Sequence, residues 1–391
     1  MSNFAIVSPR LMQVGGGSVA GLVDVLAKFG LRRPLVVTDP VMVSTGLLRR
    51  CTEPLDAAGI AYAVFSDTIP EPTDTVIVAG VAVLGAGKHD CLVAFGGGSP
   101  IDTAKAMAIL AQAPERKMRD FKVPVQNDAP GLPVIAIPTT AGTGSECTRF
   151  TVITDVEREE KMLIAGLAAL PLAAIVDYEL TYTVPKRTTA DTGVDSLTHA
   201  LEAFVSRRAN PVSDALALAA MGLIGQHLRT AYADPLNAAA REGMMLGATQ
   251  AGMAFCNSSV ALVHGMSRPI GARFHVPHGL SNAMLLPAIT RFGLEAAPQR
   301  YAAAARQAGF TTAADEAAAG QALCHGLDVL NRDLGVPTPQ AYGIAWSDWE
   351  SAMETMAEQA LASGSPANNP RIPDKAEIVA LYRQVYAGSN A

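Results

Sequence analysis

The sequence of 391 residues is poor in aromatic and charged side chains, which make up 5% and 17% of it, and its formal net charge is -6. Without an excess of positive charge, a chain gains nothing from the release of phosphate counterions, and few aromatic rings leave little for bases to stack on. We therefore expect no nucleic-acid partner. Hydrophobic residues make up 49% of the chain, which is enough apolar surface to exclude disorder as the main state.

Cysteine is also scarce: five cysteines stand at positions 51, 91, 147, 256 and 324, without a CxxC pair. An odd number at wide spacing provides neither a disulfide framework nor a structural zinc module, and the first residues do not resemble a signal peptide. We therefore expect a reduced, cytoplasmic protein. The longest run without a charged residue, Met244 to Met266, contains Gln250, Asn257 and His264. These polar side chains predict a buried helix rather than a membrane span, although the run is long enough to cross a bilayer.

The two halves of the chain have different patterns. Up to about residue 185, short β-rich runs alternate with helical stretches, and several runs are continuously apolar, as in parallel strands covered on both faces. After Pro185 the β signal fades, and Asn210 followed by Pro211 is typical of a helix start. We predict an α/β dinucleotide-binding domain in residues 1–185 and an all-helical domain in residues 186–391. The expected strands are Pro34–Thr38, Ala61–Ser66, Cys91–Phe95, Leu132–Ile137 and Ala173–Val176.

Two loops that follow expected strands favour a phosphate ligand. The first runs from Gly96 to Ser99 and opens a helix, so its glycine N–H groups and the helix N-terminus can cradle a phosphate. The second, from Pro138 to Glu146, is rich in small residues and hydroxyls that can bind a pyrophosphate or a ribose. Each loop alone is equally explained as a turn without a ligand. Two such loops at strand ends predict a dinucleotide site.

Asp39 directly follows the expected strand Pro34–Thr38. A carboxylate in this position can accept hydrogen bonds from both ribose hydroxyls and repels a 2′-phosphate, so it favours NAD over NADP. The alternative is that Asp39 caps a helix or a turn. In the usual dinucleotide fingerprint the acidic residue follows the glycines, whereas Asp39 precedes them, so this is not a standard GxGxxG unit.

Histidines and a carboxylate in the second half have the spacing of metal ligands. Asp195 and His199 are four residues apart in a helix-like segment, which puts both side chains on one face. Imidazole and carboxylate together suit Fe(II) or Zn(II), and His264 and His278 could complete a set of three nitrogens and one oxygen. The alternatives are a surface hydrogen bond between Asp195 and His199, and a core position for His264.

The sequence resembles the iron-containing (group III) alcohol dehydrogenases over essentially its whole length. This family includes lactaldehyde reductases and 1,3-propanediol dehydrogenases. The resemblance implies a metal-dependent enzyme that transfers hydride between NAD(H) and a small alcohol or aldehyde, and that is commonly a dimer or larger assembly. It also implies a dehydroquinate synthase-like architecture with the active site in the cleft between the two domains. The segments that carry the resemblance are GGGSPIDTAKA, PTTAGTGSE, VDSLTHALEAF, ANPVSDALAL and HGMSRPIGARFHVPHG.

The resemblance also implies roles for individual residues. Asp39 matches the position that discriminates NAD from NADP, and Phe150, which replaces a polar residue of some members, falls where the family lines the nucleotide site together with Lys161 and Leu180. The implied metal ligands, for Fe(II) first and Zn(II) second, are Asp195, His199, His264 and His278. The residues implied to border the cofactor phosphates are Gly97, Gly98, Ser99 and Asp102, with Thr139, Thr140 and Thr143 nearby.

One departure from the family concerns the residue four positions after His264. Many members have a second histidine there, in the pattern HGMAH, which is thought to take part in proton transfer or to line the substrate pocket. This chain has Arg268, which stays protonated near neutral pH and cannot act as a general base. His275 is a candidate substitute, with an exposed or pocket-lining loop histidine as the alternative. Arg268 or Arg273 could instead clamp a carboxylate or phosphonate group of the substrate, unless both form ordinary ion pairs.

Three other functions are compatible with this pattern, and each has a property that distinguishes it. A metal- and NAD-dependent lyase of the dehydroquinate synthase type shares the two-domain plan but recycles its cofactor. A reductase similar to maleylacetate reductases would need no metal. A binding protein without catalytic activity would be expected to have lost site residues, whereas the glycine turn and all four implied ligands are intact.

Overall fold

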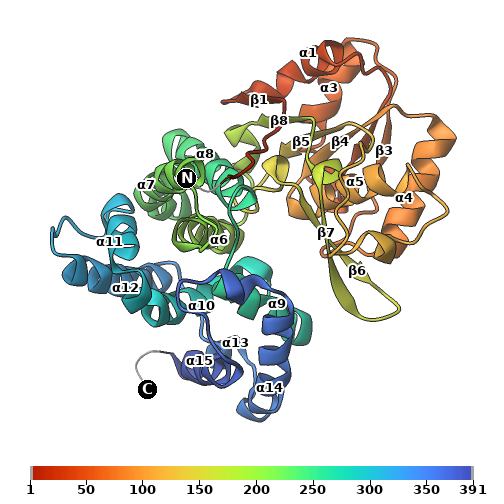
Figure 1. The fold of residues 1–391 in the computed structure, drawn as a ribbon. Coiled ribbons are helices and arrows are strands. Elements are labelled where there is room, and N and C mark those ends of the chain that lie inside the picture. The colour runs from red at the N-terminus through yellow and green to blue at the C-terminus, as the bar shows by residue number, and fades with distance from the viewer. Residues whose placement is uncertain (1–2, 389–391) are drawn as a thin grey trace. The chain divides into compact units, whose positions relative to one another are not determined.

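A six-stranded parallel sheet organises Val7–Val184, the first of two units into which the chain divides. The computed structural model describes residues 3–388, and the second unit consists of residues 185–388 together with residues 3–6. Figure 1 shows the sheet, whose strands lie in the order β1-β8-β5-β4-β2-β3. The strands are β1 (Leu11–Val14), β8 (Ala173–Val176), β5 (Val134–Pro138), β4 (Cys91–Gly96), β2 (Pro34–Val37) and β3 (Ala63–Phe65).

Side chains of the strands alternate between two hydrophobic cores, one on each face of the sheet. Leu35 and Val37 of β2 pack in the core that contains α4 (Asp74–Gly87) and α5 (Gly98–Leu110). Val36, between them, packs in the core that contains residues of α1 (Leu22–Lys28) and α3 (Arg49–Ala57). Burial on both faces explains why these strands are continuously apolar. The predicted α/β fold class of the first unit is confirmed.

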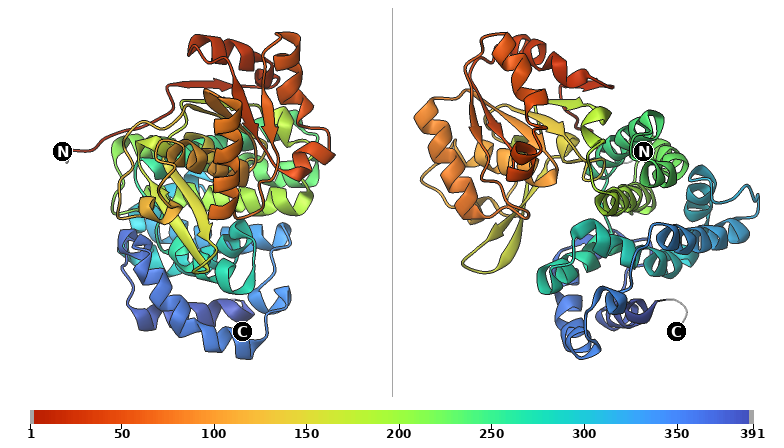
Figure 2. Two further views of the ribbon diagram at one scale, coloured as in Figure 1. Left: turned by 90° about the vertical axis from the view of Figure 1, so that its right-hand side faces the viewer. Right: turned by 180° about the vertical axis from the view of Figure 1, so that it is seen from behind.

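Three strands of this unit were not predicted. The edge strand β1 has the mixed sequence LMQV, and its residues are only partly buried. The strands β6 (Phe150–Asp155) and β7 (Glu160–Ala165) pair antiparallel in a separate two-stranded sheet. Figures 1 and 2 show this hairpin extending away from the six-stranded sheet. Because such elements are solvated on one side, they lack the long apolar runs by which the other strands were found.

The second unit is helical, as predicted, and one of its helices begins where the sequence indicated. The side chain of Asn210 accepts hydrogen bonds from the N–H groups of Val212 and Ser213, and Pro211 occupies the first turn of α7. Figure 2 shows the helices of this unit from two sides. They are α6 (Lys186–Val205), α7 (Pro211–Ala233), α8 (Ala238–Cys256), α9 (Leu262–Phe274), α10 (His278–Gly293), α11 (Pro298–Gln307), α12 (Glu316–Asp333), α13 (Pro339–Tyr342), α14 (Trp346–Ala362) and α15 (Lys375–Ala387).

The charge-free run from Met244 to Met266 is not one helix, and this prediction was wrong. It is divided between α8 and α9, which are joined by residues 257–261. Asn257 ends α8, and its side-chain N–H group donates a hydrogen bond to the carbonyl of Met253. Such a local bond competes with continuation of the helix. The run is buried as expected, with Met244 and Met266 at most 2% exposed. Within residues 3–388, no helix combines the length and apolar character that crossing a membrane requires.

Candidate functional site

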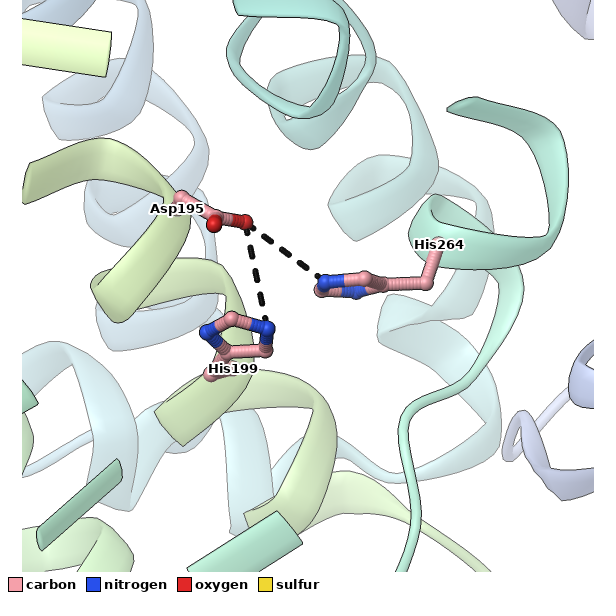
Figure 3. A group of neighbouring side chains, drawn as sticks. All are labelled: Asp195, His199 and His264. Atoms are coloured by element: carbon pink, nitrogen blue, oxygen red, sulfur yellow. Dashed lines mark ion pairs between the residues drawn. The ribbon is translucent and has the colours of Figure 1, made fainter. Parts of the chain in front are cut away.

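Helix α6 carries two of the expected metal ligands on one face. Asp195 and His199 are one helical turn apart, and their exposed fractions are 2% and 5%. Figure 3 shows both side chains turned toward His264, which α9 contributes from a distant part of the sequence. His278 is the first residue of α10. The donor atoms of Asp195, His199 and His264 therefore form one cluster, all within 4.8 Å of one another, and His278 lies beside it near Asp195.

The separations of the donor atoms fit a shared divalent ion. Oδ1 of Asp195 lies 3.5 Å from Nε2 of His264 and 3.9 Å from Nε2 of both His199 and His278. Four nitrogen or oxygen donors held about 2.1 Å from one tetrahedral ion lie roughly 3.4 Å from each other. Asp195, His199 and His264 come close to this spacing, and together with His278 they offer the imidazole and carboxylate ligands that suit Fe(II) or Zn(II).

Asn282, which was not predicted, lies among these donor atoms. Its Nδ2 donates a hydrogen bond of 2.6 Å to Oδ1 of Asp195 and lies 3.2 and 3.3 Å from Nε2 of His264 and His278. Its Oδ1 is buried without a hydrogen-bond partner in the described part of the chain. The partly positive N–H group of Asn282 thus faces the lone pairs of three candidate ligand atoms, as a bound cation would. The sequence could have indicated Asn282 only through its position four residues after His278, on the same helix face.

Glu202 holds His264 in place and was also missed. Its carboxylate accepts hydrogen bonds from the backbone N–H groups of Ala261 and Val263, at 2.9 and 2.6 Å, and from Nδ1 of His264 at 2.6 Å. Because an ionised carboxylate only accepts, the proton of the neutral imidazole is on Nδ1, which leaves the Nε2 lone pair for a metal. Glu202 lies seven residues after Asp195, on the same face of α6, and this spacing could have revealed it.

The charges of the cluster favour the metal-binding protonation states of Asp195 and His278. Burial would lower the pKa of His264, but the carboxylates of Glu202 and Asp195 raise it, so a metal bound there has to displace a proton. Burial would raise the pKa of Asp195, but the imidazoles of His199, His278 and His264 hold that pKa well below its usual range. Loss of hydration near the protein and the positive charge of neighbouring groups lower the pKa of His278 to about 3, although 45% of its side chain is exposed. At neutral pH the aspartate is therefore ionised and His278 is neutral, as metal ligation requires.

In the first unit, Asp39 lies beside the glycine turn because β2 and β4 are neighbours in the sheet. A Cβ atom on Gly96 would lie 3.4 Å from Oδ2 of Asp39. The other oxygen, Oδ1, caps α2 (Pro40–Ser44) by accepting from the N–H groups of Val41 and Met42. The chain leaves β2 toward β3 and leaves β4 toward β5, in opposite directions along the sheet. Ligands bind at the carboxyl ends of strands at such a switch point.

The glycine turn and the threonine loop lie against each other. A Cβ atom on Gly98 would come within 2.9 Å of Cγ2 of Thr143, and one on Gly97 would lie 3.5 Å from Thr140. The backbone of the turn can approach the loop this closely because it has no side chains. Thr139 follows β5, and its buried hydroxyl has no hydrogen-bond partner among residues 3–388. An orphaned hydroxyl at this position suits a polar ligand.

Asp102 joins the two loops through its side chain. Oδ1 accepts a hydrogen bond of 2.7 Å from Oγ of Ser145, and Oδ2 accepts one of 3.0 Å from the N–H of Val152. Nζ of the fully buried Lys105 lies 3.0 Å from Oγ of Ser145. Both oxygens of Asp102 are thus engaged by the protein, and the carboxylate ties α5 to the loop after β5 and to β6. Ser99 lies in the first turn of α5, as expected.

The remaining nucleotide-site residues are in different environments. Phe150 begins β6 and is half-buried, and Lys161 on β7 forms an ion pair with Glu71. The side chain of Leu180 is 1% exposed and packs in the core on the α1 and α3 face of the sheet. Only the backbone of Leu180 is therefore able to meet a nucleotide.

Arg268 lies in the middle of α9, Arg273 in its last turn and His275 directly after it, and the three differ in exposure. Arg268 is partly exposed, and its Nη1 donates a hydrogen bond of 3.1 Å to Oγ of Ser365. Arg273 is exposed in the last turn. His275 is exposed and ends the helix in the left-handed conformation, with φ 55°. Neither arginine forms an ion pair within the described residues, so the ordinary ion pairs considered above are not found.

Comparisons with known proteins agree with this geometry. Residues 9–178 match the family model described as iron-containing alcohol dehydrogenase, and residues 189–386 match the model of the C-terminal part of that family. The chain is 36% identical to lactaldehyde reductase of Escherichia coli (strain K12), over 95% of this chain and 97% of the relative. A crystal structure of 1,3-propanediol oxidoreductase is 35% identical, with a TM-score of 0.94 over 98% of this chain and 100% of that one. Sulfoacetaldehyde reductase of Bifidobacterium kashiwanohense, solved with NAD+, is 29% identical with a TM-score of 0.88, and each chain is covered over 100%.

Proposed function

Because the chain belongs to the iron-containing alcohol dehydrogenase family, we propose that it interconverts small alcohols and aldehydes with NAD(H) at a metal site formed by Asp195, His199, His264 and His278. The family, the fold class, the enzyme class and the NAD and iron cofactors that the sequence predicted are confirmed by the comparisons. The observation that carries the proposed site is the approach of four donor atoms from α6, α9 and α10.

The chemistry follows from the charges of these residues. A divalent ion bound here supplies Lewis acidity toward the substrate oxygen, which makes an alkoxide accessible and favours hydride exchange between the adjacent carbon and nicotinamide. The ionised Asp195 contributes the one negative charge of the ligand set. Glu202 keeps the proton of His264 on Nδ1, so that Nε2 faces the ion.

NAD is favoured over NADP by the position of Asp39 beside Gly96. One carboxylate oxygen is engaged in capping α2, and the other is available to accept from a ribose hydroxyl. The negative charge would repel a 2′-phosphate. The turn from Gly96 to Ser99 and the hydroxyl of Thr139 would bind the pyrophosphate and ribose part of the cofactor.

Two further properties belong to the same proposal. We expect a homodimer or larger homo-oligomer, as the family resemblance implies. We also expect the protein to act in the cytoplasm, since all five cysteines are buried and none is in a disulfide, and reduced thiols are typical of that compartment. Size-exclusion chromatography with light scattering checks the first expectation, and cell fractionation checks the second.

The metal site is tested by His264→Ala, with His325→Ala as a matched control because His325 is an exposed histidine of the same unit. We expect His264→Ala to lose bound metal and nearly all NADH oxidation, because Lewis-acid stabilisation amounts to several kcal/mol. Metal content by mass spectrometry and NADH absorbance measure both. A His264→Ala enzyme with full metal content and full rate would contradict the proposal.

The same assay separates the alternative enzyme classes. Net consumption of NADH by an aldehyde excludes a lyase of the dehydroquinate synthase type, because such an enzyme regenerates its cofactor in each turnover. Loss of activity on chelation, with recovery on adding Fe(II) or Zn(II), excludes a metal-free reductase similar to maleylacetate reductases. Tight NADH binding without turnover of any aldehyde would favour a binding protein.

A further inference from the structure

Arg268 lies one helical turn after His264 on α9. Residues four apart on a helix have Cβ atoms about 5–6 Å from each other and project from the same face. Any molecule whose oxygen reaches the four ligands therefore has Arg268 within a few bonds of it.

The guanidinium has more hydrogen-bonding capacity than the protein uses. It has five N–H donors, and its partner is the neutral hydroxyl of Ser365. No carboxylate of residues 3–388 lies within ion-pair distance of it. The nearby Glu202 already accepts three hydrogen bonds, from Ala261, Val263 and His264.

This environment disfavours a purely structural role for the charge. Surrounding a cation with protein and placing no carboxylate within ion-pair distance is unfavourable, because part of its hydration is lost without a direct partner. Arg268 is nevertheless partly exposed, so a small molecule can reach it. The planar guanidinium group of an arginine can bind two oxygens of a carboxylate, sulfonate or phosphonate at once.

We propose that Arg268 is an anion-binding subsite next to the metal ligands, and that the preferred substrates are short-chain aldehydes carrying a carboxylate, sulfonate or phosphonate group. The inference rests on the proposed function and adds the substrate class to it. The reaction is the same: hydride passes from NADH to the carbonyl carbon, and the oxygen takes a proton from water. The anionic group provides the direct ion pair that Arg268 does not form with any carboxylate of residues 3–388.

The test compares aldehydes of equal or similar length with and without the anion. Succinate semialdehyde is paired with butanal, and sulfoacetaldehyde and phosphonoacetaldehyde are each paired with propanal, using the metal-loaded enzyme and NADH. We expect kcat/KM to be at least about tenfold higher for the anionic member, by analogy with other close charge pairs. The pair with the largest ratio identifies which of the three anions fits the subsite.

Variants then assign the preference to Arg268. We expect Arg268→Gln to lower the anionic-to-neutral ratio of kcat/KM at least about tenfold, to a value near one, because the charge that produces the preference is removed. Arg268→Lys should give an intermediate ratio, because it keeps a point charge without the fork. Arg273→Gln is the matched control, since this arginine is exposed on the same helix, and it should leave the ratio unchanged.

A binding measurement provides a readout that does not depend on turnover. Succinate should bind calorimetrically to the metal-loaded protein with NAD+, and Arg268→Gln should weaken this binding at least about tenfold. A wild-type ratio near one, or a ratio that Arg268→Gln and Arg268→Lys leave unchanged, overturns the anion subsite. Failure of every aldehyde to oxidise NADH contradicts the proposed function instead, so the two failures are distinguishable.

Discussion

The two candidate binding regions of this chain are built in different ways. In the nucleotide region, short contiguous loops act through their backbone and lie next to each other because β2, β4 and β5 are neighbours in one sheet. In the metal region, single side chains come from three helices and are held by further buried side chains such as Glu202 and Asn282. We therefore expect the metal region to be sensitive to charge and the nucleotide region to be sensitive to added volume.

The largest effect is expected when the charge of the metal region is removed. Asp195→Asn keeps the shape of the side chain but takes away the anionic ligand, whose low pKa shows how strongly the imidazoles favour its ionised form. Metal affinity should fall by more than about 100-fold, and turnover should become undetectable. Metal competition with a chelator measures the first effect, and NADH oxidation measures the second.

The comparison of the two regions requires that Asp195→Asn leaves NADH binding intact. Fluorescence titration with NADH should give the wild-type Kd, because Asp195 belongs to the helical unit and none of its described contacts involves the glycine turn. A parallel loss of NADH affinity and of melting temperature would mean that the variant is misfolded and that the charge argument is wrong.

A smaller effect is expected for Glu202, which contacts His264 rather than an ion. Glu202→Gln places an N–H donor where only acceptors fit, since all three of its partners donate. Loss of such a partner typically weakens metal binding or activity by about 10- to 100-fold. Glu242→Gln is a suitable control, because Glu242 is exposed on α8.

Substitution with Co(II) separates positioning from general instability. If Glu202 orients His264, the visible absorption of the Co(II)-loaded Glu202→Gln protein should shift in position or intensity relative to wild type. The spectrum of Glu242→Gln should not shift. An unchanged spectrum and metal affinity in a folded Glu202→Gln variant would show that Glu202 does not position the ligand.

The sequence predicted the ligands of the metal region better than their supports. Asp195 and His199 share a helix face, so spacing alone associates them. His264 and His278 were candidates to complete the set, and the family resemblance implied the same four residues. Glu202 and Asn282 have the same kind of spacing, but their role depends on where α9 and α10 pack against α6. Packing between distant helices is a tertiary property, and a single sequence without that packing gives no reason to choose these polar residues over others.

The fold shows the same limit. Strands with two buried faces, such as β4, are continuous apolar runs and were predicted closely. The half-exposed hairpin of β6 and β7 was missed, because its polar residues conceal the pattern. The run from Met244 to Met266 was assigned to a single helix because it contains no charged residue, whereas the capping bonds of Asn257 end the helix at Cys256.

In the nucleotide region we expect an effect of added volume. Gly98→Ala would bring a methyl group within 2.9 Å of Cγ2 of Thr143, and relieving such an overlap typically costs about 1–3 kcal/mol. The Kd for NADH should rise roughly tenfold as the turn and the loop move apart, while metal affinity should not change. Gly85→Ala is the control, because nothing lies within 4 Å of the added atom.

The double variant Gly98→Ala with Thr143→Ser tests the cause directly. Serine lacks the Cγ2 methyl group but keeps the hydroxyl that accepts from the N–H of Ser145. NADH affinity should therefore recover toward the wild-type value. A double variant that binds NADH as weakly as Gly98→Ala would indicate that the overlap is not responsible.

The smallest effect is expected at Asp39, which combines two roles. Asp39→Ser keeps a side-chain oxygen that can cap α2, a function that costs about 1 kcal/mol when it is lost altogether, but it removes the negative charge beside Gly96. The ratio of kcat/KM with NADPH to that with NADH should therefore rise about tenfold, with little change in melting temperature. Asp39→Ala removes both functions and should add a loss of stability to the same change in preference. Equal cofactor ratios in wild type and Asp39→Ser would mean that the carboxylate acts only as a helix cap, and that the order of the acidic residue and the glycine turn along the chain has no bearing on cofactor choice.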